Sequence, residues 1–112
     1  MVLIYADSES QTLYIPIPVP DAVDNISLKA RSTTEGVEVS FNIVRSESVG
    51  YILQALIDTP QELFAGEWEY TLAYETAEGE EFTATGLMMA YLKDAPEAKQ
   101  YNEEIQYKQY GE

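Results

Sequence analysis

Apolar and polar residues alternate with a period of two over most of this chain. In residues 37–43 every second position is apolar, beginning at Val37, and the positions between them are polar. The same pattern occurs in residues 26–30 and again around Trp68. Successive side chains of a β-strand point to opposite faces of a sheet, so the pattern predicts strands with one face buried.

Turn residues separate seven such segments, as is typical of an all-β domain. The predicted strands are residues 1–5, 11–19, 26–30, 37–43, 51–57, 66–75 and 81–92, and residues 46–50 are expected to form a loop. Residues 51–57 are apolar on both faces, which fits a strand buried on both sides, with a short helix as the alternative. Gly86 indicates a bulge or a close backbone approach. The sequence predicts an antiparallel β-sandwich, Ig-like or jelly-roll-like, with a partly open β-barrel as the alternative.

The predicted second strand carries prolines at three alternate positions, Pro16, Pro18 and Pro20. Residues two apart direct their main-chain N–H groups to the same edge of a strand, and proline has no N–H. The spacing therefore predicts an edge strand whose outer side is blocked against a further strand. A polyproline-like linker is the alternative.

The composition changes after Leu92. We therefore divide the chain into a β-domain, residues 1–92, and an extended tail, residues 93–112, that docks on a sheet edge or on a partner subunit. Tyrosine combines a large contact area with a polar tip and is enriched at interfaces. The candidate interface residues are in the tail: Tyr101, Ile105, Tyr107 and Tyr110.

Charge and composition exclude several functions. The chain has 112 residues, 20 acidic and 6 basic side chains, and a net charge of −14. Such a charge repels phosphate backbones and anionic membranes, so neither nucleic acid nor a membrane is an expected partner. The absence of His and Cys removes disulfides, thiolate chemistry and the most common general base.

No catalytic, metal or cofactor site is predicted. The acidic residues lack the spacing of a calcium-binding loop, and no phosphate-binding glycine motif occurs. Glu67 and Glu69 lie two apart on an exposed strand face, which lacks the cleft that paired catalytic carboxylates need. The row that contains Trp68, Tyr70 and Tyr74 is interpreted as a core face, with a sugar-binding platform as the alternative. We expect no enzyme.

The first five residues are apolar but too short for a signal peptide, and no basic residue precedes them. No apolar run reaches the length of a membrane span. We therefore expect a protein that is cytoplasmic at synthesis, with later assembly into a virion as an alternative location.

Three stretches resemble a known family. Residues 63–72 read Leu-x-x-Gly-Glu-Trp-Glu-Tyr-x-Leu, residues 85–88 read Thr-Gly-Leu-Met, and residues 107–111 read Tyr-x-Gln-Tyr-Gly. The pattern resembles small β-rich structural proteins of tailed phages and prophages of gut bacteria. The chain departs from it by having Trp68 where Tyr is more usual. The resemblance implies a role in the virion or tail, and it carries over no catalytic residues.

The sequence therefore predicts a non-enzymatic structural or assembly protein, of phage or prophage origin, that works through protein–protein contacts in self-association or in a larger particle. One alternative is a small carbohydrate- or protein-binding module, with a glycan as ligand. A second is an acidic mimic that inhibits a nucleic-acid-binding protein.

Overall fold

The computed structural model describes residues 1–22 and 24–93, which form seven β-strands and no helix. The prediction of an all-β fold is confirmed. No part of these residues provides a helix that could cross a membrane. The strands are β1 (Val2–Tyr5), β2 (Ser10–Pro16), β3 (Asp24–Ser32), β4 (Glu38–Val49), β5 (Ile52–Asp58), β6 (Gly66–Glu75) and β7 (Glu81–Tyr91).

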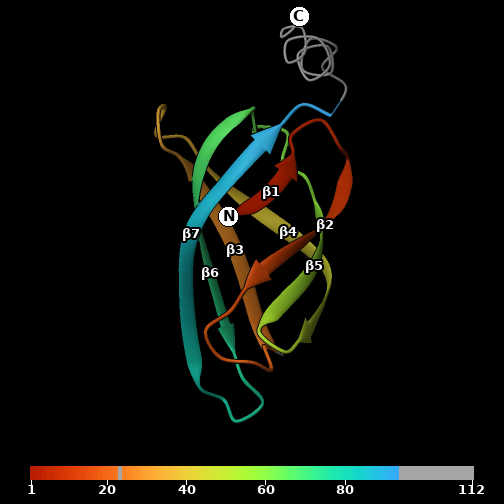
Figure 1. The fold of residues 1–112 in the computed structure, drawn as a ribbon, viewed down its shortest axis with the longest axis vertical. Coiled ribbons are helices and arrows are strands. Elements are labelled where there is room, and N and C mark those ends of the chain that lie inside the picture. The colour runs from red at the N-terminus through yellow and green to blue at the C-terminus, as the bar shows by residue number, and fades with distance from the viewer. Residues whose placement is uncertain (23, 94–112) are drawn as a thin grey trace, which may run out of the picture.

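All seven strands belong to one sheet, in the order β1-β7-β6-β3-β4-β5-β2, which curls into a nearly closed barrel (Figure 1). β4 joins the two halves, because Glu38–Phe41 pair with β3 and Asn42–Val49 pair with β5. Two layers sharing one long strand are compatible with both the predicted sandwich and the predicted partly open barrel.

The barrel is incomplete between β1 and β2, the two end strands of the sheet. β1 pairs in parallel with β7, whereas every other strand pair is antiparallel. The Gln11 side chain connects the two end strands: its Oε1 accepts from Tyr5 N–H at 2.8 Å and its Nε2 donates to Tyr5 O at 2.8 Å. Gln11 Nε2 also donates to Thr59 Oγ1 at 2.8 Å. One amide side chain thus replaces main-chain pairing at this end of the opening.

β4 is longer than predicted, and the prediction of a loop at residues 46–50 is wrong, because the strand continues to Val49. The pairing register of β4 with β5 shifts between Ile43 and Arg45, which identifies a bulge at Val44. A bulge changes which residues point inward. Before it the inward positions are apolar, and after it they are occupied by Ser46 and Ser48, so the second half of the strand does not resemble a strand in sequence.

Two further predictions are partly correct. Residues 51–57 were expected to form a strand buried on both faces. The strand is confirmed as β5, which pairs at both edges, with β4 and β2. Only one of its faces is buried, because Leu53, Ala55 and Ile57 lie in the core while Gln54 and Leu56 lie on the outer face. The register of β6 with β7 passes Gly86 without a shift, so no bulge forms there. The close approach is confirmed: a Cβ atom at Gly86 would lie 2.8 Å from Tyr70 Cε2 and from Tyr70 Oη. The aromatic ring occupies the space that a side chain would need.

The inward faces of the strands form one hydrophobic core, whose largest side chains come from β6. The Tyr74 hydroxyl donates to Val19 O at 2.8 Å and accepts from Val19 N–H at 3.1 Å. These two bonds attach the proline-containing segment to the sheet, which argues against the linker alternative. Apart from Lys93, the predicted tail lies outside the described residues, as do Tyr101, Ile105, Tyr107 and Tyr110.

Candidate functional site

The predicted aromatic row on β6 is part of the core. Trp68, Tyr70 and Tyr74 have relative exposures of 0%, 5% and 1%. Trp68 Nε1 donates to Phe64 O at 2.9 Å, and the two rings lie 4.8 Å apart between centroids. Burial raises the pKa of Tyr70 above its ordinary value. Because these three rings are buried, they cannot serve as a sugar-binding platform, and that alternative is wrong. The three residues pack in the core.

The acidic side chains are dispersed over the surface. Glu67 and Glu69 lie on the outer face of β6, where Glu67 accepts a hydrogen bond from Thr33 Oγ1 at 3.2 Å. Among the residues that the structure describes, no three His, Cys, Asp or Glu residues are grouped to hold a metal ion.

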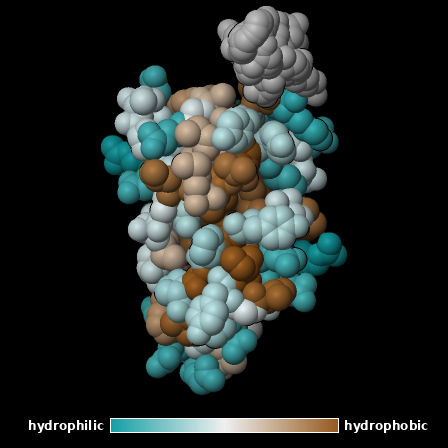
Figure 2. Space-filling model, in the orientation of Figure 1, coloured by the Kyte–Doolittle hydropathy of each residue, from teal (hydrophilic) through white to brown (hydrophobic). Residues whose placement is uncertain are grey.

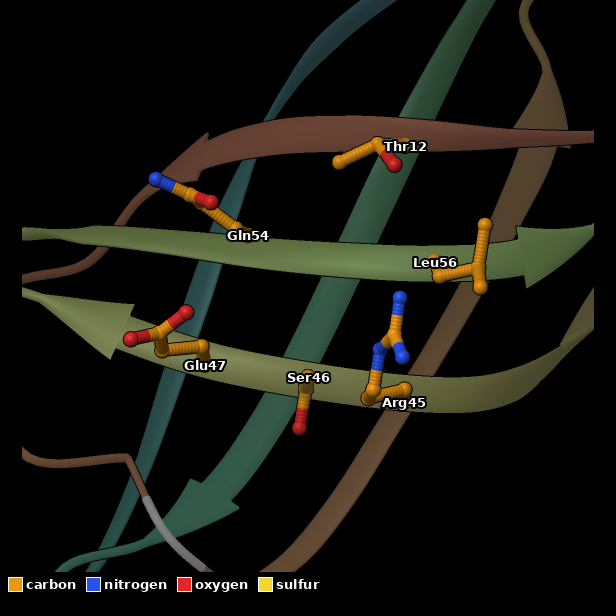
Figure 3. A pocket seen from close by; sticks show the side chains of 6 residues that line it. All are labelled: Thr12, Arg45, Ser46, Glu47, Gln54 and Leu56. Atoms are coloured by element: carbon orange, nitrogen blue, oxygen red, sulfur yellow. The ribbon is translucent and has the colours of Figure 1, made fainter.

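A polar groove crosses the outer face of β2, β5 and β4 (Figure 3). Its volume is about 490 Å³. The pairing register forms two rows across the strands, Thr12–Leu56–Arg45 and Tyr14–Gln54–Glu47. The groove is lined by Thr12, Arg45, Ser46, Glu47, Gln54 and Leu56. Neither Arg45 nor Glu47 makes an ion pair with another described residue. Sequence analysis missed this site because Val44, the bulged residue, hides the alternation that would have placed Arg45 and Glu47 outward.

A second surface is apolar and lies on the outer face of β1 and β7. Leu3 pairs with Met89 and Tyr5 with Tyr91, which brings the two strands' outward side chains together. We call this surface the apolar strip; it comprises Met1, Leu3, Tyr5, Leu87, Met89, Tyr91 and Leu92. Met1 is 71% exposed and Leu3 58%. Figure 2 shows hydrophobic surface in the middle of the face that carries β1, β2 and β7, bordered by polar residues.

Next to the strip, part of β7 has an unpaired edge. β1 pairs only with Met88–Tyr91, so the outer edge of β7 from Glu81 to Leu87 has no strand beside it among the described residues. Thr76 N–H donates to Glu80 O at 2.9 Å, and the register then makes the even-numbered residues of β7 pair with β6. Thr83 and Thr85 therefore direct their main-chain N–H and C=O groups away from the sheet, where no described residue binds them.

The opposite edge of the sheet, on β2, carries a proline at its end. Ile17 N–H donates to Tyr51 O at 2.9 Å, so odd-numbered residues of β2 pair with β5. Pro16, the last residue of β2, therefore directs its nitrogen to the free side, where it has no hydrogen to donate. The prediction of an edge strand is confirmed, but only Pro16 blocks it, because Pro18 and Pro20 lie beyond its end.

Comparison of the chain with family models, with curated proteins and with solved structures gives no match. The candidate surfaces described above are the polar groove, the apolar strip and the open edge of β7.

Proposed function

We propose that this chain is a non-enzymatic structural or assembly protein whose contact surface is the apolar strip. The supporting observation is the combination of exposure and charge. The side chains of the seven residues of the strip carry no charge, on a chain whose net charge is −14. A contiguous exposed apolar patch bordered by polar residues is typical of a protein–protein contact site, because water solvates it poorly.

The proposed setting is a virion or tail of a phage or prophage, in keeping with the strand-pattern resemblance. The protein acts there through self-association or within a larger particle, after synthesis in the cytoplasm. The acidic surface disfavours nucleic acid and anionic membrane as partners. A protein partner that covers the strip removes apolar area from water without bringing carboxylates together.

The test places a charge in the strip and compares it with a matched charge elsewhere. Leu3→Glu introduces a carboxylate at a position that is 58% exposed, and Val44→Glu does so at a position on β4 that is 56% exposed. We expect Leu3→Glu to abolish self-association or partner binding, measured by light scattering, while Val44→Glu leaves it unchanged. Equal behaviour of the two variants would contradict the proposal.

The tail is tested separately by comparing the full chain with a chain that ends at Lys99. If the candidates Tyr101, Ile105, Tyr107 and Tyr110 contribute to the interface, the shortened chain loses its oligomeric state. If the state is unchanged, the tail is not part of the interface and the strip is sufficient.

A small glycan-binding module is the second candidate, supported by the polar groove. Arg45, Glu47 and Gln54 supply planar polar groups, and Tyr14 beside Gln54 is 60% exposed and offers a ring face. Sugar rings bind between such groups and aromatic faces. Titration of a glycan library by NMR is expected to shift groove residues, and Arg45→Ala to remove the shifts. Lys29→Ala, which removes a cation outside the groove, is the control.

A further inference from the structure

We infer that the open edge of β7 pairs with the same edge of a second copy of this chain, so that two barrels join through a continuous antiparallel sheet. This inference rests on the proposed function, because it names the partner and the geometry of the contact. The observation that carries it is the row of unpaired main-chain groups at Thr83 and Thr85.

The edge lacks the features that normally prevent strand pairing. Natural edge strands carry prolines, charges or bulges, or another element covers them. Glu81 is the one charged residue of the open edge and lies at its end; residues 82–92 contain neither proline nor a charged residue. The register of β6 with β7 is continuous, so the edge has no bulge. Thr83 and Thr85 are exposed, so no described side chain covers them.

A twofold axis through Ala84 satisfies the unpaired groups. It places Thr83 opposite Thr85 of the second copy, and Thr85 opposite its Thr83, so the N–H and C=O groups of both residues find partners. It also places Glu81 opposite Leu87, so no carboxylate faces another across the new pair. Threonine pairs across antiparallel strands are favourable, because branched side chains pack well there.

The apolar strip supplies area that the edge alone lacks. Stable interfaces bury about 1,200–2,000 Å² in total, which is more than one pair of short strands provides. Leu87 belongs to both the edge and the strip, and Leu3 lies on the neighbouring strand. The two surfaces therefore form one continuous contact region at the start of β1.

The partner is a second copy because the open edge is complementary to itself, and the charge distribution permits this contact. Two chains of net charge −14 repel each other over most of their surfaces, and at physiological ionic strength this repulsion is screened beyond about 8 Å. An approach along residues 82–88 brings uncharged backbone and side chains together and keeps the acidic surfaces at the sides. The same strand meets itself in this geometry, so the complementarity of the two edges is automatic.

The experiment substitutes proline on each edge of the sheet in the full chain. Thr85→Pro removes an N–H that points away from β6 and so removes no bond within the barrel. Thr12→Pro is the matched control, because its N–H points away from β5 on the edge that Pro16 already blocks at its end. Light scattering and sedimentation equilibrium are expected to give a dimer for the natural chain and for Thr12→Pro. Thr85→Pro is expected to weaken association by at least about tenfold through the lost bond and the blocked approach.

Three results would overturn the inference: a natural chain that is monomeric at every concentration, a folded Thr85→Pro variant that still dimerises, or equal loss of association in both variants. If Thr85→Pro fails to fold by circular dichroism, Thr85→Lys takes its place, because it keeps the N–H and places the cations of the two copies as diagonal neighbours across the twofold axis, each opposite Thr83 of the other copy. A dimer that Leu3→Glu dissociates but neither Thr85 variant affects would refute strand pairing and leave the proposed function standing. A dimer that both kinds of variant dissociate is the expected result.

Discussion

The two exposed edges of this sheet both lie in uncharged stretches and differ in their proline content. The two longest stretches without a charged residue, 10–20 and 82–92, have eleven residues each. The first contains β2, an end strand of the sheet, and the second contains most of β7, whose first half has an unpaired edge. The first stretch has three prolines and the second has none. Pro16, at the end of β2, leaves the pairing with β5 intact and removes a donor from the free side.

The comparison shows how a chain can protect one edge selectively. Charge is a common protection for an edge strand, and this chain has many carboxylates, yet the only one on either edge is Glu81 at the end of β7. Proline blocks the end of the β2 edge, whereas the first half of the β7 edge is able to pair with another strand. If the barrel had only to avoid aggregation, both edges would need protection. The difference between them is therefore the strongest reason to assign the function to the β7 side.

The largest effect is expected from Gly86→Ala, which tests how the open-edge strand is held. The new Cβ atom would lie 2.8–2.9 Å from three atoms of the Tyr70 ring, and the ring is buried. We expect the free energy of unfolding to fall by about 1–3 kcal/mol through overpacking. Urea unfolding measures the change.

A double-mutant cycle with Tyr70→Leu separates overpacking from a general loss of stability. Once the ring is removed, the alanine at position 86 has space, so Gly86→Ala is expected to cost less in that background. Additive costs would mean that the contact between Tyr70 and Gly86 does not limit the packing of β7.

A smaller effect is expected from Gln11→Ala, which removes the link between the two end strands. The side chain makes three hydrogen bonds, to Tyr5 N–H, Tyr5 O and Thr59 Oγ1, each 2.8 Å long. Water replaces part of this bonding, so we expect a loss of about 1–2 kcal/mol. Hydrogen exchange is expected to accelerate at Tyr5 in particular. Gln54→Ala on the outer face of β5 is the control, and an equal loss there would contradict a special role for Gln11.

The sequence predicts strands well where an apolar face or an apolar run marks them. β3, β5, β6 and β7 were all predicted within two residues at each end. β3 and β6 alternate apolar and polar residues, while β5 is a short apolar run bounded by turn residues. The second half of β4 was missed, because the bulge at Val44 interrupts the alternation and Ser46 and Ser48 then point inward. The parallel pairing of β1 with β7 joins the first and last strands. It was not predicted, because the pattern of neighbouring residues carries no information about contacts between distant parts of the chain.

The candidate site was less predictable than the fold. The proline spacing predicted which edge of β2 is free, because a proline has no main-chain N–H and cannot donate a hydrogen bond to a neighbouring strand. The apolar strip requires knowing that Leu3 lies beside Met89, a neighbour relation that arises only from the topology. The open edge of β7 follows from the short length of β1, which covers four residues of an eleven-residue strand. The tail residues Tyr101, Ile105, Tyr107 and Tyr110 stay predictions.

The smallest change in stability and the sharpest change in association are expected when the blocked edge is opened. Pro16→Thr gives the free side of β2 an N–H donor, and Pro18→Thr restores an N–H just beyond the strand; the Ile17 bond to Tyr51 stays in place. Each substitution is expected to lower the free energy of unfolding by about 0.4–1 kcal/mol, because the unfolded chain gains freedom. Light scattering is expected to show species larger than those of the natural chain.

The control and the decisive variant use the same two edges. Pro60→Thr, in the connection between β5 and β6, removes a proline away from either edge and is expected to leave the mass unchanged. Adding Thr85→Pro to the substitutions at Pro16 and Pro18 exchanges the roles of the edges: β7 becomes blocked and β2 open. If the prolines alone decide which edge pairs, this variant still associates, and a nitroxide label on Thr12 then reports proximity to its copy while a label on Thr83 does not. If association is lost instead, β2 lacks something that β7 has, and the apolar strip beside β7 is the feature that differs.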